Sequence, residues 1–518
     1  MRLINSIKNV GAAMTSYILA MLIGIVAQSI LVRYLGIEYN GLNGLFSNIV
    51  SMLSIAELGI GSAVVYHLYR PIAEKDTEKI KSLMGFYKKA YRFIAVVIGI
   101  VGICIIPFLN IIVGETTISS KEIYVIFGLF LFDTVCSYLL TYKRSLLYAD
   151  QKNYVINLIH ILYTVFLNAI QIYIIITMRN FILYLIVKVI FRILENLIIT
   201  IYTNKKYPYI LEKNIEKLDN DIYKDIMKKV KALLYHKVGG YLIDGTDNVI
   251  ISMFLGISSV GIITNYKVIL NAMSSLISQI FNAITASVGN LLVSESKDKV
   301  YDTYKKLSLM NFFVFYISSI VLCMAINLII KVIYGGEYLM GTIEVCVLMT
   351  NFYMQGMKKN IQLFKEAACI FYEDRYMPLL EAIANLVLSV IFVKFLGIAG
   401  VILGSILSSL VVFLYSYPKY VYKKIMDRKR SEYIFEQFKY LLIFIITMII
   451  IIILQHFIKI DNNVLNLLVN VVISFIISGT IFIITYYRTN EFKYYKGILF
   501  DALRKIMKGK NNEAKSKL

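Results

Sequence analysis

The sequence predicts an all-α polytopic membrane protein with about fourteen transmembrane helices, arranged as two pseudo-repeated six-helix lobes plus two C-terminal helices. Composition is the first reason. Of 518 residues, 58% are hydrophobic and only 17% are charged, and the mean hydropathy is +0.69. A water-soluble domain carries about 25% charged residues. The second reason is block length, because apolar runs such as 17–32, 93–113 and 441–457 approach the roughly 20 residues that cross a bilayer as a helix.

The third observation is the placement of basic residues between the apolar runs. The expected spans are 11–33, 41–69, 90–113, 122–142, 154–178, 181–203, 233–256, 259–293, 308–333, 343–365, 377–396, 398–418, 439–458 and 464–487. Segments on one side of this topology hold 41 of the 54 Lys and Arg residues. Cytoplasmic loops carry such an excess, so both termini are expected in the cytoplasm and the chain in the cell (inner or plasma) membrane. The excess suits anionic membrane lipids and requires no nucleic acid.

A short motif recurs at the outer ends of spans. It reads YLGIEYNGL at Tyr34–Leu42 and FLGISSVGI at Phe254–Ile262, with a weaker copy, FLGIAGVIL, at Phe395–Leu403. Duplicated halves are common in transporters. We therefore expect Gly36, Gly256 and Gly397 to cap helices, with Gly36 and Gly256 at matching outer turns. Three independent tight turns are the alternative interpretation.

The repeat and the topology together predict the domain organisation. The expected parts are an N-lobe at 1–203 (spans 1–6), a cytoplasmic amphipathic linker at 204–232, a C-lobe at 233–418 (spans 7–12), a helix pair at 419–487 (spans 13 and 14) and a basic cytoplasmic tail at 488–518.

Polar residues recur at helical spacing inside several spans. Such stripes avoid lipid, so they predict a water-filled cavity between the lobes. The candidate substrate-binding residues of a cationic cavity are Lys267, Lys358, Lys359, Lys365, Asn271, Asn282 and Gln355. The candidate coupling or cavity acids are Asp244, Asp247 and Glu57, with Lys267 as the expected partner of the two aspartates. An unbalanced lysine group on span 10 would suit an anionic ligand, phosphate in particular.

Inter-helix pairing is the alternative role for these groups. It is favoured for Arg192 and Glu195, which lie three residues apart on one helix beside Lys188. For the lysines of span 10, only Glu366 is an acid close in sequence. The sequence leaves both roles open.

Long stretches of the chain resemble the polysaccharide and oligosaccharide flippases (Wzx-like) of the multidrug/oligosaccharidyl-lipid/polysaccharide exporter superfamily. The resemblance rests on ILVRYLGIEYNGLNGLFSNIVSMLSIAELGIGSAVVYHLYRPIAEKD, on DGTDNVIISMFLGISSVGIITNYKVI with QIFNAITASVGNLL, and on FKEAACIFYEDRYMPLLEAIANLVLSVIFVKFLGIAGVILGSILS. It covers spans 1 to 14.

The resemblance implies transport by alternating access. The implied substrate is an undecaprenyl-diphosphate-type lipid-linked glycan, a repeat unit of capsule, exopolysaccharide or O-antigen, moved from the inner to the outer leaflet. The implied cavity cations are Lys267, Lys358 and Lys359, and spans 13 and 14 would flank a groove for the polyprenyl tail. We expect a monomer that works beside a polysaccharide polymerase.

No cofactor or metal is expected, and the protein is not expected to be an enzyme. The five cysteines and four histidines form no CxxC or zinc pattern. No P-loop appears, so ATP is not expected as the direct drive, and coupling to a proton or sodium gradient is left open. Two alternatives remain: a multidrug or cation antiporter, which would favour an acidic cavity, and a membrane-embedded polysaccharide polymerase or glycosyltransferase, which would need a large polar loop. A structural scaffold would not need repeated intramembrane charge.

Overall fold

A computed structural model describes residues 2–57, 60–212, 218–368, 370, 372–457, 460–498 and 500–501. Helices and turns make up this part of the chain and no strand occurs in it. Eight of its helices are long and apolar enough to cross a membrane by length and composition. The predicted all-α, multi-pass architecture is therefore confirmed, whereas the number of fourteen spans stays a prediction.

The chain forms two compact units, which we describe separately. Unit 1 comprises Met1–Ile269 and Arg375–Ser408, and unit 2 comprises Leu270–Asp374 and Ser409–Leu518. The predicted N-lobe ends at residue 203 and the predicted C-lobe begins at residue 233, so the predicted boundaries differ from those of the two units. Superposition of the two lobes stays a prediction. The predicted linker also merges with a span, because one helix runs without a break from Asn220 to Leu255.

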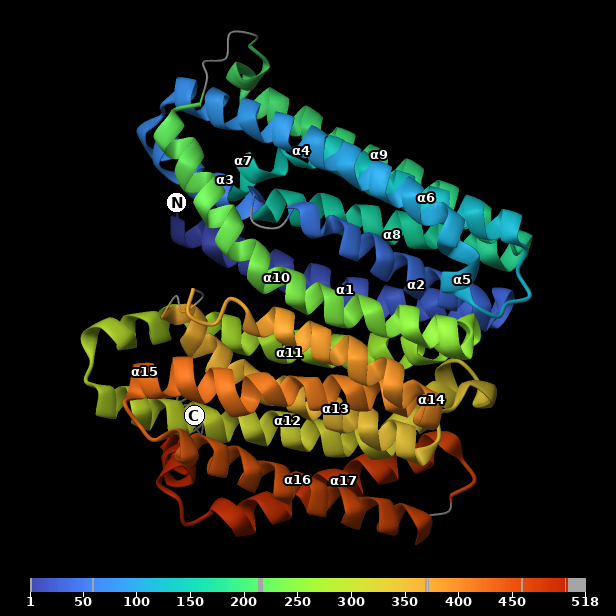
Figure 1. Ribbon diagram of the computed structural model, residues 1–518, viewed down its shortest axis with the longest axis vertical. Coiled ribbons are helices and arrows are strands. Elements are labelled where there is room, and N and C mark those ends of the chain that lie inside the picture. The colour runs from blue at the N-terminus through green and yellow to red at the C-terminus, as the bar shows by residue number, and fades with distance from the viewer. Residues whose placement is uncertain are drawn as a thin grey trace, which may run out of the picture. The chain divides into compact units, whose positions relative to one another are not determined.

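Unit 1 contains the N-terminal helices in Figure 1. Its elements are α1 (Arg2–Leu35), α2 (Ile37–Leu53), η1 (Ser54–Glu57), α3 (Ile60–Glu74), α4 (Thr77–Ile105), η2 (Ile106–Phe108), α5 (Leu109–Val113), α6 (Ser120–Thr141), α7 (Arg144–Ala149), α8 (Asn153–Met178), α9 (Phe181–Lys206), η3 (Pro208–Leu211), α10 (Asn220–Leu255), the first part of α11 (Ile257–Ser294) and most of α14 (Met377–Val411).

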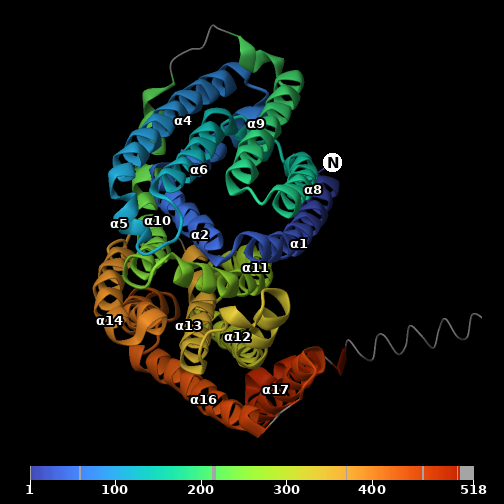
Figure 2. The ribbon, with the colours of Figure 1, turned by 90° about the vertical axis from the view of Figure 1, so that its right-hand side faces the viewer.

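Five helices of unit 1 close a ring. In Figure 2, α1, α8, α9, α6 and α2 follow one another around it, and each packs against the next. The helix α4 packs on the outside of α6. The second expected span, 41–69, is not one helix, because the 3₁₀ turn η1 separates α2 from α3. This break places Ser54 and Glu57 at a helix end inside the unit.

Unit 2 is built around α12. Its elements are the rest of α11, α12 (Lys297–Ile333), η4 (Gly336–Tyr338), α13 (Thr342–Ala367), the π-helix η5 (Val412–Tyr422), α15 (Lys423–Met426), α16 (Arg430–Phe457) and α17 (Asn463–Tyr486). Helix α12 packs against α13, α16 and α17, and α13 and α16 both pack against η5. Stacked aromatic rings fill the contacts, with Tyr353 and Phe444 parallel at 4.2 Å between centroids.

The repeated motif marks equivalent backbone turns. Gly36 and Gly256 have φ of 94° and 79°, with ψ of 171° and 165°. Gly397, in the weaker copy, has φ of 56° and interrupts α14. Residues with a Cβ rarely adopt these positive φ values, so glycine is required at each helix junction. The expected turns at Gly36 and Gly256 are thus present and conformationally alike.

The first two motif copies also contact each other, as a reciprocal pair. A Cβ on Gly41 would lie 2.2 Å from the carbonyl oxygen of Ile257, and a Cβ on Gly261 would lie 2.3 Å from that of Ile37. Each isoleucine and each glycine holds the same place in its own motif. Such a reciprocal contact is what a local two-fold axis produces. We conclude that the repeat is structural at this point; superposition of whole lobes stays a prediction.

Candidate functional site

A cavity of about 280 Å³ lies inside unit 1, between α6 and α9. Its lining residues are Val50, Ser54, Asp133, Thr134, Ser137, Tyr138, Thr141, Arg144, Arg192 and Asn196. The side chains come from α2, η1, α6, α7 and α9, and most of them are polar. Polar groups at the interior of an apolar helical bundle indicate a functional role by default.

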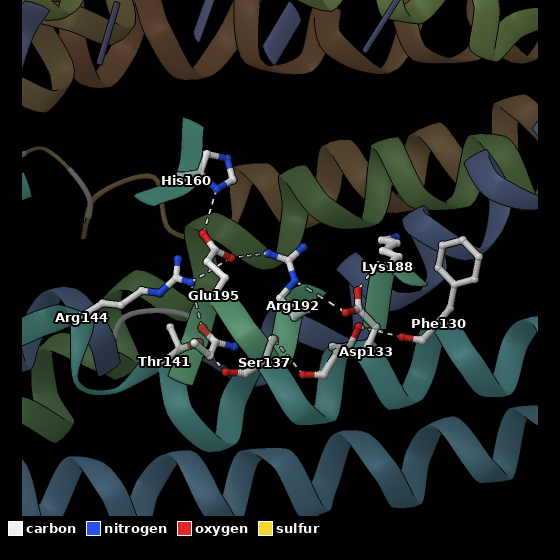
Figure 3. A network of polar contacts seen from close by, with 11 residues as sticks. Phe130, Asp133, Ser137, Thr141, Arg144, His160, Lys188, Arg192 and Glu195 are labelled. Atoms are coloured by element: carbon white, nitrogen blue, oxygen red, sulfur yellow. Dashed lines mark hydrogen bonds and ion pairs between the residues drawn. The ribbon is translucent and has the colours of Figure 1, made fainter. Parts of the chain in front are cut away.

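Charged side chains form a network beside this cavity, and we call it the α6–α9 ion cluster (Figure 3). Its members are Asp133, Arg144, His160, Lys188, Arg192 and Glu195. Glu195, whose side chain is fully buried, lies at its centre. Its Oε2 is 3.1 Å from Nη2 of Arg144 and 3.4 Å from Nη1 of Arg192, and its Oε1 is 2.9 Å from Nδ1 of His160.

Asp133 extends the ion cluster along α6. Its carboxylate lies 3.6 Å from Nε of Arg192 and 3.9 Å from Nζ of Lys188. The Lys188 ammonium also lies over the ring of Phe130, 4.6 Å from its centroid. The ion cluster therefore sets two arginines, a lysine and a histidine against two carboxylates.

Arg192 and Glu195 form the ion pair that the sequence favoured. Glu195 also pairs with Arg144 and His160. Sequence reasoning passed over Asp133 and Arg144. A signal existed for the first, since Asp133, Ser137 and Thr141 repeat every four residues on one face of α6. Arg144 follows the expected span 122–142 directly, where a basic residue is typical of a cytoplasmic loop.

Lysines of the predicted cationic group occupy three different settings in unit 2. Lys365 is buried and forms an ion pair with Asp374, which also accepts a hydrogen bond from Ser416 at 3.1 Å. Lys358 is also buried, and its ammonium lies 5.9 Å from the ring centroid of Phe413. The carboxylate beside Lys365 comes from the segment after α13, nine residues along the chain, and this favours the pairing role for that lysine.

Lys359 lines a small polar pocket of about 70 Å³ between α11 and α13. The lining is Ser278, Phe281, Asn282, Thr285, Lys359, Gln362, Leu363 and Glu366. Gln362 donates a hydrogen bond to the hydroxyl of Tyr417 at 3.0 Å, so its amide is held in place. Lys359 and Asn282, which the sequence placed on two different spans of one predicted cavity, line the same pocket, and Glu366 lines it too. Asn271 and Gln355 are exposed side chains of α11 and α13.

Lys267 and Asp247 lie in unit 1, on α11 and α10. Lys267 donates to Oδ1 of the buried Asn248 at 3.0 Å. Asp247 accepts a hydrogen bond from Ser405 at 2.8 Å, and Ser405 in turn accepts one from Asn385 at 2.9 Å. Lys267 therefore contacts Asn248, the residue that follows Asp247 in α10.

Further oxygen atoms belong to the hydrogen-bonded group that Ser405 joins to Asp247. Thr246 donates to carbonyl oxygens of its own helix and lies 3.5 Å from Oδ1 of Asn385. Ser389 donates to the carbonyl of Val401 at 3.2 Å. Carboxylate, amide, hydroxyl and carbonyl oxygens are the ligands of hard cations such as the alkali and alkaline-earth ions. The group formed by Asp247, Ser405 and Asn385 offers oxygens of the kinds that such cations bind.

The other two predicted acids are Glu57 and Asp244. Glu57 accepts a hydrogen bond from the buried hydroxyl of Tyr91, which itself accepts one from Tyr87 at 2.7 Å. Glu57 therefore belongs to a buried tyrosine chain at the end of η1. The side chain of Asp244 lies outside the described residues.

Comparison with solved structures gives the fold. The chain is similar to the lipid II flippase MurJ in an inward closed conformation, with a TM-score of 0.62 and 15% identity, over 94% of this chain and 99% of that one. It is similar to an inward-facing multidrug resistance MATE family transporter of the MOP superfamily, with a TM-score of 0.61 and 14% identity, over 76% and 93%. The bent form of the Vibrio cholerae MATE transporter VcmN gives a TM-score of 0.52 at 11% identity, over 83% and 99%.

These similarities show that the chain has the fold of MOP superfamily transporters, as the sequence resemblance implied. A sequence comparison with curated proteins gives no significant match. The family model described as "Polysaccharide biosynthesis protein" matches residues 30–342, which is more than half of the 518 residues. The chain therefore belongs to the polysaccharide biosynthesis protein family.

Proposed function

We propose that this protein is a flippase that moves an oligosaccharide linked to a polyprenyl diphosphate from the inner to the outer leaflet by alternating access. Family membership supplies the link to polysaccharide synthesis, and the fold is that of MOP transporters. The observation that carries the proposal is the polar cavity with its ion cluster among membrane-spanning helices. An enzymatic role is not part of this proposal.

Physical chemistry explains why such a protein is needed. A diphosphate-sugar head cannot cross hydrocarbon unaided, since the idealised cost of desolvating a single ion is on the order of 20 kcal/mol. Polar side chains that face a shielded route replace the lost water. The multidrug antiporter remains the alternative with the same fold, and it would move cationic drugs rather than a glycolipid.

We assign the diphosphate to Lys267, Lys358 and Lys359. Lysine is a point-charge phosphate ligand on a flexible stem, which suits a ligand that must later be released. Lys365 is less suited, because Asp374 already compensates its charge. Of the three, Lys359 is the one whose described surroundings include a pocket with amide and hydroxyl groups.

Replacing all three lysines with glutamine tests this assignment. The triple variant Lys267→Gln, Lys358→Gln, Lys359→Gln should reach the membrane at normal levels and lose most export of the lipid-linked sugar, because the diphosphate loses its counter-charges. Lys359→Glu alone should impair export more than Lys359→Gln. The matched control is Lys299→Gln, at an exposed pair with Glu295. Undiminished export by the triple variant at normal expression would refute the cationic site.

We further propose that Asp247 binds the coupling cation, a proton or sodium ion, within the oxygen group formed with Asn385 and Ser405. Asp244 and Glu57 are the other candidates. If Asp247 couples, Asp247→Asn should make export insensitive to the ion gradient while the protein stays folded. A variant that keeps wild-type gradient dependence would assign the coupling elsewhere.

The charge distribution supports an orientation with both termini in the cytoplasm. We also propose that the protein works as a monomer beside a polysaccharide polymerase. Cysteines introduced at positions 214 and 512 should be shielded from an impermeant thiol reagent in intact cells. Labelling at either position from outside would reverse the orientation.

A further inference from the structure

We propose that the 280 Å³ cavity of unit 1 binds a pyranose ring of the transported glycan through the hydroxyl groups of the sugar. The inference rests on the proposed function and adds a glycan subsite to it. This subsite is distinct from the three lysines assigned to the diphosphate. The hydrogen-bond donors and acceptors of the cavity determine which ligand it can hold.

Four hydroxyl side chains on the cavity lining have already used their protons. Ser54 donates to the carbonyl of Val50 at 2.9 Å, and Thr134 donates to that of Phe130 at 3.0 Å. Ser137 donates to the carbonyl of Thr134 at 2.8 Å, and Thr141 donates to that of Ser137. A hydroxyl has one proton and two lone pairs, so these oxygens can only accept further hydrogen bonds. This wall therefore requires a ligand that donates.

The α9 side of the cavity offers donors. Asn196 is 2% exposed, its Oδ1 accepts from Arg144 at 2.8 Å, and its Nδ2 has no hydrogen-bond partner among the described residues. A buried donor left unsatisfied costs free energy, so this amide is suited to a ligand that accepts. Arg144 and Arg192, also on the lining, supply further N–H groups.

A ligand that satisfies both walls must donate and accept hydrogen bonds at closely spaced positions. Sugar hydroxyls do both. An ionised phosphate or carboxylate group only accepts, so it would face the four hydroxyl oxygens unfavourably. The cations here are also already shared with Asp133 and Glu195. The volume is close to the lower limit of known small-molecule sites and exceeds the share of a single water many times.

Direct binding is the first test. The purified full chain, in a detergent without a sugar head, is mixed with millimolar methyl glycosides of hexoses, 6-deoxyhexoses, N-acetylhexosamines and hexuronic acids, and with pyrophosphate as the anion probe. At least one glycoside should raise the thermal unfolding midpoint in a saturable way. No stabilisation by any glycoside would overturn the proposal.

Two variants locate the binding. Thr134→Val with Thr141→Val removes two acceptor oxygens at nearly constant shape, and Asn196→Asp replaces the unpartnered donor with an acceptor. Each should weaken binding of the glycoside by about tenfold or more. Thr350→Val is the matched control, because Thr350 donates to its own helix in the same way on α13 and does not line the cavity. Equal affinity in wild type and both cavity variants would place the sugar elsewhere and overturn the proposal.

A measurement of lipid-linked glycan export distinguishes the sugar subsite from the proposed flippase function. If wild type flips the glycolipid and binds no glycoside, the subsite is wrong while the flippase stands. If glycosides bind but no glycolipid is flipped, the subsite stands as a sugar site and the proposed function fails. If pyrophosphate raises the thermal unfolding midpoint of the wild type but not of Asn196→Asp, the cavity is an anion site and the sugar assignment is overturned.

Discussion

Glu195→Gln should destabilise unit 1 by about 3–5 kcal/mol, the cost typical of breaking a buried ion pair from one side. The fully buried carboxylate of Glu195 compensates Arg144 and Arg192 and accepts from His160. Glutamine keeps the shape but removes the charge, which leaves two guanidinium groups with a single remaining carboxylate in the ion cluster. The midpoint of thermal unfolding in detergent measures the effect.

An exposed pair on the same unit supplies the control. Arg70 and Glu74 form an i, i+4 pair at 2.8 Å with exposed side chains. Exposed pairs of this kind contribute about 0.3–0.5 kcal/mol. Glu74→Gln should therefore melt like wild type. If Glu195→Gln melted with it, the ion cluster would not be the stabilising centre of unit 1.

Gly41→Leu should prevent α2 and α11 from packing, because a Cβ at this position already lies 2.2 Å from the carbonyl oxygen of Ile257. Backbone atoms cannot give way as a side chain can. Even Gly41→Ala should cost about 1–3 kcal/mol, the usual range for overpacking. Small residues at helix interfaces in membranes permit this close approach. The measurements are the unfolding midpoint and the fraction of monodisperse protein.

Local hydrogen bonds make the same contact specific. Asn40 donates to the carbonyl of Gly261 at 3.0 Å and to Oδ1 of Asn265 at 2.9 Å. Gly261→Ala should thus resemble Gly41→Ala, since the two contacts are reciprocal. Gly128→Ala on α6 is the control, because its Cβ would meet open space. A Gly41→Leu variant as stable as Gly128→Ala would show that the motif copies do not pack as described.

Hydropathy and helix periodicity predicted most of the helices, because a span must satisfy its backbone internally and its length follows from the bilayer. Two breaks were not predictable in this way. The span 41–69 is interrupted at η1, and 90–113 is interrupted by the turn Ile106–Phe108, which contains Pro107. Segment 41–69 is apolar enough for one span although it contains Ser54 and Glu57, and segment 90–113 contains a helix-breaking proline. Mean hydropathy registers neither the local geometry nor the proline.

Polar spacing predicted candidate site residues but not their partners. The lysines of span 10 looked like one cationic group in sequence, yet Lys365 pairs with Asp374 from the following turn. Asp133 and Arg144 join Arg192 and Glu195 although they come from three different helices. Partners that are distant in sequence depend on tertiary packing, and one sequence does not reveal them.

Flipping by the purified protein in liposomes tests the central claim most directly. The liposomes carry a fluorescent polyprenyl-diphosphate oligosaccharide in both leaflets, and an added glycosidase cleaves only the outward-facing sugar. With the wild-type protein and an ion gradient, cleavage should proceed beyond the share initially in the outer leaflet, and the Lys267→Gln, Lys358→Gln, Lys359→Gln variant should fall well short of that extent. Cleavage that stops at the outer-leaflet share, as in protein-free liposomes, would contradict the account.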